Sequence, residues 1–487
     1  MNSSIEKNQD HINEIKMAFH RVKWNTVATV FDKVVSFLLT PLLAYRFMPD
    51  QIGFLSLMLI VGFYVNTLSD MGLANAAGRE VSKTKDVLLA RYTMTYRSLS
   101  LVAIVILGAV ILPWIHVEAK TFAFIILMLI ASVGTSYNLS WFYLSIDKAH
   151  WTVVINLTKS GFLLFGTFFF VKRADDLNKL AVIFILAHSA YAILNFYLLQ
   201  KFSGGIFCTM KQFKELWSRF MKSAFINCVL LFLILIYNSI DTVLLSYLSD
   251  LSSAGFYNIG AKIPKTAQEA IFIFGAGLFP SLVRWSDRKR NLEKIVSNMI
   301  TLFSLIVLPP VLLIGLFSEK LTLFLFSSSF YNSWMILYLL APCVILFFIN
   351  NTFRMIAIAS SHEKYAMRIT LVGLLINIGL NVVFIPLYQE LGCIVALFVS
   401  EVLMAFAYNI VFKRHLGISI SIAKSLLLVF GSYTFLWFAK GIMHLHEFVL
   451  LVGVVLFSVL LLLLNREWIF RMVSDYLLPK RESELYV

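Results

Sequence analysis

Uninterrupted apolar runs of about twenty residues recur along the whole chain and are separated by short polar connectors. A helix needs about 20 apolar residues to cross the hydrocarbon core of a bilayer. The runs are continuous and do not alternate between apolar and polar positions, which argues against a transmembrane β-barrel. The pattern therefore predicts an all-α, polytopic membrane protein with about fourteen transmembrane helices. The predicted spans lie near residues 24–47, 52–70, 98–117, 121–145, 152–171, 178–200, 223–248, 255–283, 295–317, 333–358, 367–387, 391–412, 423–443 and 446–464.

Charged residues interrupt the eighth predicted span, which contains the stretch NIGAKIPKTAQEAIFIFGAGLFP at 258–280. Its polar residues are spaced at i, i+4, i+7 and i+11 and so share one face of a helix: Asn258, Lys262, Lys265 and Glu269. Pro264 removes one backbone hydrogen bond and should bend the helix near Gly260. A charge at mid-bilayer costs about 2.5–3.5 kcal/mol. This face is therefore expected to meet water and a polar ligand rather than lipid.

Other predicted spans carry polar stripes of the same kind, and together these faces could line one cavity. The stripes are Thr29, Lys33, Ser36 and Thr40 with Asp32 beside them in the first span; Asn156 and Lys159 in the fifth; His188 and Asn195 in the sixth; Asn227, Asn238 and Asp241 in the seventh; Asn350 and Arg354 in the tenth; Asn377 and Asn381 in the eleventh; and Glu401 and Tyr408 in the twelfth.

A purely structural interpretation is open for several of these residues. Intramembrane asparagines often only join helices, at about 0.6 kcal/mol per hydrogen bond. Lys265 and Glu269 can form a neutral internal pair, Lys159 can extend to the interface, and His188 can be a packed histidine. The cations within spans nevertheless outnumber the acids, and an excess of cations favours an anion such as a phosphate or diphosphate ester. The cations are Lys33, Lys159, Lys262, Lys265 and Arg354, and the acids are Asp32, Asp241, Glu269 and Glu401.

Composition and charge agree with a membrane protein. The 487 residues are 59% hydrophobic and 14% charged, with a mean hydropathy of +0.82. The net charge of +14 does not indicate nucleic-acid binding, because most Lys and Arg fall in alternate connectors. This asymmetry predicts that both termini are cytoplasmic. The few external cations are Arg46, Lys120, Lys172, Arg173, Lys179, Lys320 and Lys440.

Neither a disulfide, a metal site nor a cofactor is expected. The four cysteines, Cys208, Cys228, Cys343 and Cys393, are scattered without a CxxC pair. The chain has no GxxxxGK[ST] motif, so it is not expected to hydrolyse ATP. Its first twenty-odd residues are polar and do not resemble a cleavable signal peptide, so the first span should serve as the insertion signal.

A faint internal repeat organises the chain into two halves. LLAYRFMPDQIGF at 42–54 and LLSYLSDLSSAGF at 244–256 both fit LL-x-Y-x7-GF, at an offset of 202 residues. Each copy bridges the first and second spans of a six-span unit, and such parallel repeats occur among transporters. The predicted regions are a cytoplasmic segment at 1–22, six-helix bundles at 23–220 and 221–415, an extra helix pair at 416–465, and a cytoplasmic tail at 466–487.

Three stretches resemble the Wzx-type polysaccharide flippases of the multidrug/oligosaccharidyl-lipid/polysaccharide exporter superfamily. They are LLTPLLAYRFMPDQIGF at 38–54, DTVLLSYLSDLSSAGFYNIGAKIPKTAQEAIFIFGAGLFPSLVRW at 241–285, and NNTFRMIAIASSHEKYAMRITLVGLLINIGLNVVFIPLYQELGCIVALFVSE at 350–401. The resemblance implies two six-helix bundles around a central cationic cavity and transport by alternating access. It implies an undecaprenyl-diphosphate-linked oligosaccharide as substrate. By position, Lys33, Lys262, Lys265 and Arg354 correspond to cavity cations.

The resulting hypothesis is a flippase for lipid-linked repeat units of O-antigen or a similar surface polysaccharide in lipopolysaccharide biosynthesis, in a bacterial inner membrane. A lipid II flippase differs mainly in the sugar and stays an alternative. A drug or cation exporter of the same superfamily is disfavoured by the cations in the spans. A polymerase or ligase is disfavoured because the external connectors are short, so no enzymatic activity is expected. The lipid-linked substrate and the bilayer are the expected partners, with a polysaccharide polymerase and a chain-length regulator as further candidates.

Overall fold

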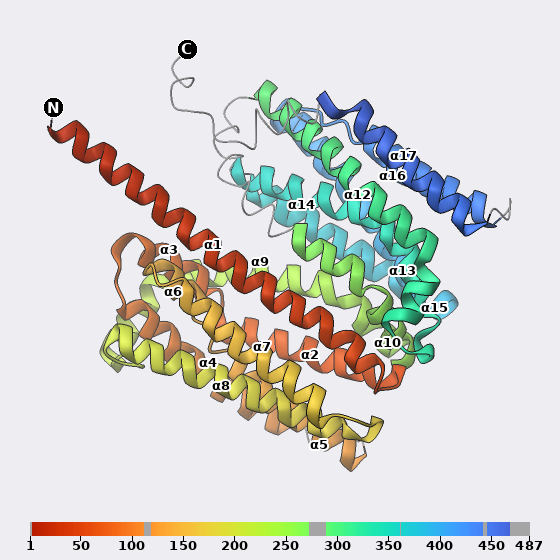
Figure 1. Cartoon of the computed structure of the whole chain (residues 1–487). Helices are drawn as coiled ribbons and strands as arrows, with labels where there is room; N and C mark the ends of the chain where they lie inside the picture. Colours follow the sequence, from red (N-terminus) through yellow and green to blue (C-terminus); the bar gives the residue numbers. More distant parts are fainter. Residues whose placement is uncertain (1, 112–117, 272–288, 361, 442–445, 468–487) are drawn as a thin grey trace. The chain divides into compact units, whose positions relative to one another are not determined.

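The computed structural model describes residues 2–111, 118–271, 289–360, 362–441 and 446–467 (Figure 1). These residues form helices and connecting turns, without a β-strand among them. The chain divides into two compact units, Met1–Gly255 and Phe256–Val487. The predicted all-α polytopic fold is confirmed.

The first unit is built on long helices that pack lengthwise. Within it α1 packs on α7, α7 on α8, α8 on α5, and α2 on α4, α5 and α9. The elements are α1 (Asn2–Ala44), α2 (Pro49–Asp70), α3 (Leu73–Thr84), α4 (Leu88–Ile111), α5 (Ala119–Thr135), α6 (Ser140–Ser145), α7 (His150–Phe170), η2 (Ala174–Asp176), α8 (Leu177–Ser203) and α9 (Met210–Leu248).

The second unit packs α14 on α15, and α16 and α17 on α12. Helix α10 (Leu251–Gly260) begins in the first unit and ends in the second. After Ala261 the described residues 262–271 are also helical. The remaining elements are α12 (Lys289–Leu325), η3 (Ser328–Phe330), α13 (Ser333–Leu340), η4 (Ala341–Cys343), α14 (Val344–Ala359), α15 (Glu363–His415), α16 (Ala423–Gly441) and α17 (Glu447–Leu464).

Eleven helical segments of the described chain are long and apolar enough to cross a membrane. One of them, α15, contains two predicted spans, because the backbone leaves helical geometry at Gln389 (φ 49°, ψ −123°). The thirteenth predicted span coincides with α16, whereas part of the eighth lies outside the described residues. The predicted number of fourteen therefore stays a prediction.

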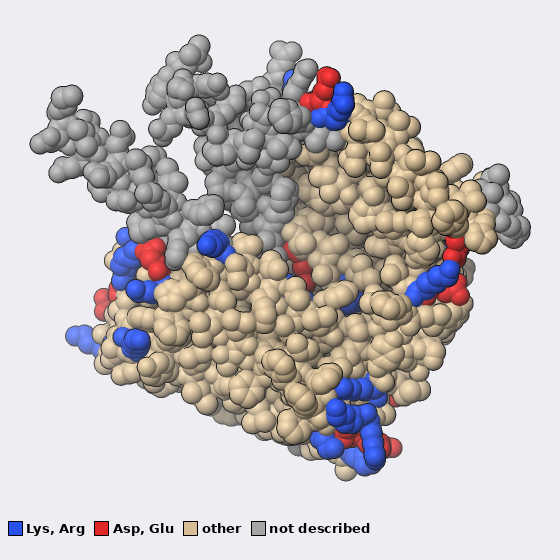
Figure 2. Space-filling model, in the orientation of Figure 1, with Lys and Arg blue, Asp and Glu red and all other residues tan. Residues whose placement is uncertain are grey.

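Charged side chains of the first unit gather at the ends of its helices. Figure 2 shows groups of blue and red atoms at these ends and a broad uncharged band between them. Ion pairs lie in both groups: Arg219 with Glu80 at 2.9 Å and Lys85 with Asp147 at 2.9 Å in one, and Lys179 with Asp176 at 2.7 Å in the other. This distribution is the one that a bilayer imposes on a spanning protein.

The longest predicted connectors are largely helical. The connector at 71–97 contains α3 and the first ten residues of α4, and most of the connector at 201–222 is the beginning of α9. The extensions form because an apolar and aromatic core continues beyond the spans: Leu73, Tyr92, Phe142 and Phe220 are buried in one cluster. Helix α9 packs on α2, α3 and α4, so the first unit ends later than residue 220. The two predicted six-helix bundles stay a prediction.

Candidate functional site

An ion pair lies inside the spanning helices of the first unit. Lys159 Nζ on α7 is 2.8 Å from Asp32 Oδ1 on α1, and the Ser160 hydroxyl donates to the same oxygen at 2.7 Å. Lys159 Nζ also lies 5.8 Å from the centre of the Tyr191 ring on α8, within reach of a cation–π interaction. The sequence placed Asp32 and Lys159 on separate stripes, and the structure brings them together.

The ion pair is not sealed from its surroundings. The side chain of Lys159 is 21% exposed and that of Asp32 is 31% exposed. An ion pair in a span avoids lipid because the charged groups lose their hydration there without compensation. An open side that met water would avoid this loss, and the predicted cavity lining stays a prediction.

Two other polar residues of α1 form hydrogen bonds within their own helix. The hydroxyl of Thr29 donates to the carbonyl of Asn25 at 2.8 Å, and that of Thr40 donates to the carbonyl of Ser36 at 3.0 Å. These bonds stay within the helix, as is common for threonine in membrane spans. Lys33 is partly buried next to Asp32.

Several predicted polar residues of the first unit join helices. Asn195 is fully buried, donates to the Tyr191 carbonyl at 2.9 Å and accepts from the Tyr143 hydroxyl at 3.3 Å. His188 is buried and packs against Gly134, where an added Cβ would lie 2.7 Å from the His188 carbonyl oxygen. The structural interpretation holds for both residues.

The polar residues of the seventh predicted span differ in burial. Asp241 is 3% exposed, whereas Asn238 is exposed and its amide donates to the Ile234 carbonyl of its own helix at 2.9 Å. The side chain of Asn227 lies outside the described part of the chain. Asn156 on α7 is partly buried.

A second polar cluster is buried in the second unit, between α14 and α15. The Asn350 amide donates to Glu401 Oε2 at 2.6 Å and to the Glu401 carbonyl at 2.8 Å. Asn350 is 4% exposed and Glu401 is 3% exposed. Arg354 follows Asn350 by one helical turn and is partly buried. The tenth and twelfth spans are therefore joined through a buried carboxyl group.

Two asparagines predicted to share a face do so inside α15. The Asn381 amide donates to Asn377 Oδ1 at 3.0 Å, and both side chains are buried. Tyr408, on the second half of α15, is also buried and packs edge-on against Phe353 of α14. The three residues are thus part of the packed interior of the second unit.

The residues that interrupt the eighth span form a partly buried stripe. Asn258, Lys262, Lys265 and Glu269 are all partly exposed, whereas Ala261 and Pro264 between them are buried. Lys265 Nζ lies 4.9 Å from the centre of the Tyr257 ring. Helix α10 ends at Gly260, which agrees with the bend predicted from Pro264.

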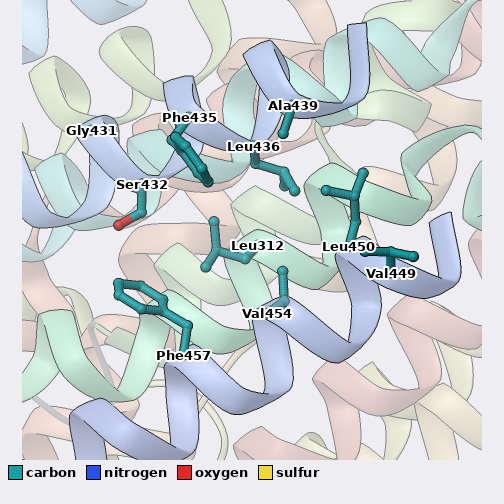
Figure 3. A pocket seen from close by; sticks show the side chains of 11 residues that line it. Leu312, Gly431, Ser432, Phe435, Leu436, Ala439, Val449, Leu450, Val454 and Phe457 are labelled. Carbon is teal, nitrogen blue, oxygen red and sulfur yellow. The ribbon is translucent and has the colours of Figure 1, made fainter. Parts of the chain in front are cut away.

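An apolar groove of about 530 Å³ lies between α12, α16 and α17 (Figure 3). Leu312, Leu436 and Val454 point into it, and Phe435 and Phe457 flank it. Ser432 supplies the one hydroxyl group of the lining. Such a groove accommodates a hydrocarbon chain.

The described residues contain no group of three or more His, Cys, Asp or Glu side chains that could hold a metal ion. Asp32 is paired with a lysine and a hydroxyl group, and Glu401 with an amide. Of the two clusters, only the partly exposed pair of Lys159 and Asp32 is accessible enough to exchange its internal partner for a polar group of a ligand.

The family described as "Polysaccharide biosynthesis protein" matches residues 20–286, which is more than half of the chain. The chain belongs to this family. The resemblance seen in the sequence is thereby confirmed. In the archaeon Haloferax volcanii, a relative named as a probable low-salt glycan biosynthesis flippase, Agl15, is 25% identical over 181 residues. That match covers 37% of this chain and 37% of the relative.

Solved structures show the fold of this polysaccharide biosynthesis family member. The lipid II flippase MurJ in an inward closed conformation has a TM-score of 0.69 at 14% identity, over 92% of this chain and 99% of MurJ. An inward-facing multidrug-resistance MATE family transporter of the MOP superfamily has a TM-score of 0.62 at 12% identity, over 80% and 98% of the two chains. These relatives are transporters and flippases, and not enzymes.

The sequence did not single out one buried ion pair of this family member. Arg97 on α4 donates from Nε to Asp70 Oδ1 at 3.0 Å and also from Nη2 to the same oxygen. Its Nη1 donates to the Asn138 carbonyl, and the Asp70 carboxylate accepts from the Ala74 amide. Both residues lie at the boundary of a predicted span, where a charge is expected to be solvated. The sequence does show that Asp70 ends one predicted span and that Arg97 directly precedes another, and this was the signal from which the ion pair could have been predicted.

We expect the substitution Asn350→Ala to destabilise the protein by about 1–3 kcal/mol, because Glu401 would lose its buried amide donor. Asn351→Ala is the matched control, since Asn351 is equally buried and its amide donates to the Met355 sulfur at 3.9 Å, which is a weak acceptor. Thermal unfolding of the purified protein in detergent measures both. Equal losses in the two variants would show that the bonds to Glu401 contribute little.

Proposed function

We propose that this protein is a flippase that moves undecaprenyl-diphosphate-linked oligosaccharide repeat units across the bacterial inner membrane by alternating access. The units would build O-antigen or a similar surface polysaccharide. Both termini would be cytoplasmic, and a polysaccharide polymerase and a chain-length regulator would receive the translocated units.

The observation that carries this proposal is the half-accessible ion pair of Lys159 and Asp32 inside spanning helices. A diphosphate that reached Lys159 would replace one anionic partner by another, so the cation would stay compensated throughout. Lys33 lies beside the pair on α1. In the second unit, Lys262, Lys265 and Arg354 are partly exposed cations within spans. We propose that both sets bind the anionic head group along its path.

The apolar groove of the second unit supports a substrate with a long hydrocarbon chain. Its lining is aliphatic and aromatic apart from Ser432, which suits an isoprenyl chain and not a sugar. A lipid-linked saccharide consists of a hydrocarbon chain, a diphosphate and a sugar, and the groove and the cations suit the first two of these parts. The groove and the cations therefore support the same class of substrate.

A cationic drug fits these features poorly, because the cations of the spans would repel it. A lipid II flippase uses the same two features, since its substrate is also a lipid-linked diphosphate saccharide. Complementation of a strain that lacks its flippase, with repeat units of defined sugars, separates these two substrates.

We expect Lys262→Ala and Arg354→Ala each to lower the surface polysaccharide at least about tenfold, since each removes a charge-assisted contact of about 1.5–3 kcal/mol. Lys83→Ala on α3 is the control, because this exposed lysine lies outside the spans and should leave the polysaccharide unchanged. Polysaccharide is quantified in the complemented strain, with the amount of protein in the membrane measured in parallel. Normal polymer from both test variants would refute the role of these cations.

A further inference from the structure

The two copies of the repeated sequence meet within the first unit. The motif LL-x-Y-x7-GF places Gly53 in the first copy and Gly255 in the second, 202 residues apart. Gly53 is the fifth residue of α2, and Gly255 is the fifth residue of α10. Each glycine packs on the first residue of the other helix.

The contact is reciprocal and involves backbone atoms. A Cβ added to Gly53 would overlap the carbonyl oxygen of Leu251 and lie 3.0 Å from the amide nitrogen of Gly255. A Cβ added to Gly255 would overlap the carbonyl oxygen of Pro49 and lie 2.7 Å from its carbonyl carbon. Pro49 and Leu251 are also 202 residues apart, so the contact has a local two-fold relation.

Only glycine allows two helices to approach this closely, because any side chain would occupy the space of the opposing carbonyl group. The approach is closer than that of Gly134 on α5, whose added Cβ would lie 2.7 Å from the His188 carbonyl oxygen, against 1.9 Å from the opposing carbonyl oxygens here. Gly108 on α4 and Gly161 on α7 also lie in spanning helices of the first unit, yet a Cβ on either would have nothing within 4 Å.

Both helices begin with their own caps, independently of the contact. The Met48 amide donates to Gln51 Oε1 at 3.0 Å at the start of α2, and the Ser253 amide donates to Asp250 Oδ1 at 2.7 Å at the start of α10. Separating the glycines would therefore break no hydrogen bond of either helix. Weak contacts between carbonyl groups and Cα hydrogens, not ion pairs, would be lost.

We infer that the Gly53–Gly255 contact is a gate at the end of the protein predicted to be external, closed while the two helices touch. This inference rests on the proposed transport by alternating access. The contact stands at the end of the unit where the Gln51 amide donates to the Ala174 carbonyl at 3.0 Å, in the predicted external connectors. A tight contact that opens without unwinding a helix is suited to repeated opening and closing.

The test uses Gly53→Ala and Gly255→Ala in a full-length variant with its four cysteines replaced by alanine and one reporter, Ser36→Cys. Ser36 lies on the polar stripe of α1 and is exposed. The reaction rate of the reporter with a membrane-impermeant maleimide is measured in right-side-out and inside-out vesicles. We expect each alanine to raise the rate from outside by about tenfold, because the closed state loses its close packing.

Gly161→Ala is the control, since its added methyl group meets nothing, and its rate should match that of the parent. Unchanged external labelling in both gate variants, or an equal rise in the control, would overturn the inference. Failure of both gate variants to reach the membrane as folded protein would also overturn it, because the contact would then be needed for folding. Labelling does not depend on which saccharide is carried, so an error in the proposed substrate would leave this result unaffected.

Discussion

Proteoliposomes containing the purified protein should accumulate a lipid-linked diphosphate saccharide in the outer leaflet about a thousandfold when the lumen is held 100 mV negative. Each negative charge that moves out of the negative compartment gains about 2.3 kcal/mol per 100 mV. A diphosphate carries about two such charges, so the gain is on the order of 4–5 kcal/mol. The full bias requires that the protein cations stay in place while the substrate crosses.

The experiment imposes a potassium diffusion potential at equal pH and sodium concentration on both sides. Protein-free liposomes and proteoliposomes without a potential are the controls, and the fraction of substrate reachable by an enzyme added outside is measured. Flipping that ignores the potential and follows a proton or sodium gradient would refute potential-driven export. The acids within the spans would then be the coupling sites.

The contacts of Asp32 favour neutralisation over coupling. Asp32 is held by Lys159 at 2.8 Å and by the Ser160 hydroxyl, so its charge is already compensated. We therefore propose that any ion coupling is secondary to the membrane potential.

Arg97→Ala should lower the free energy of unfolding by about 3–5 kcal/mol, because it leaves the Asp70 carboxylate buried without its partner. The Arg97 side chain is 3% exposed and that of Asp70 is 13% exposed, so water cannot replace the lost bonds. The pair also links α4 to the end of α2, to the start of α3 and to the Asn138 carbonyl. Denaturant titration of the purified protein in micelles measures the loss.

Arg91→Ala is the control on the same helix. Arg91 is partly exposed and donates to the Phe207 carbonyl at 3.0 and 2.7 Å, so we expect a loss of about 1 kcal/mol. The double variant Asp70→Asn, Arg97→Met should recover most of the stability that Arg97→Ala loses, because no unpaired charge remains. Equal losses in Arg91→Ala and Arg97→Ala would contradict the argument.

The helical fold could be predicted because a bilayer demands long apolar segments with internal hydrogen bonding, and these are visible in any sequence. The helical extensions beyond the spans could not. Their core of Tyr92, Phe142 and Phe220 comes from three separate segments that have no common period. Likewise, hydropathy located the predicted spans on both sides of Gln389, but it did not predict that a single residue with non-helical backbone angles would separate them.

Helical spacing identified the polar positions within the spans but not the partners of their side chains. Periodicity placed Asp32 on α1 and Lys159 on α7, and only the packing of α1 on α7 brings their charges together. Asn195 and His188 followed the same pattern and serve packing instead. A polar residue in a span has the same sequence signature whether it faces another helix or a ligand, so spacing cannot separate the two cases.

The reversal at Gln389 has a consequence for the biogenesis of this protein. If both termini are cytoplasmic, as predicted, Gln389 and Glu390 are the polar residues that have to be translocated between the two predicted spans of α15. Lys364 precedes the first of these predicted spans and Arg368 is its second residue, whereas Lys413 and Arg414 follow the second span, so basic residues lie at both predicted inner ends. Residues 363–415 are therefore suited to leave the translocon together, as one helical hairpin, rather than as two successive spans.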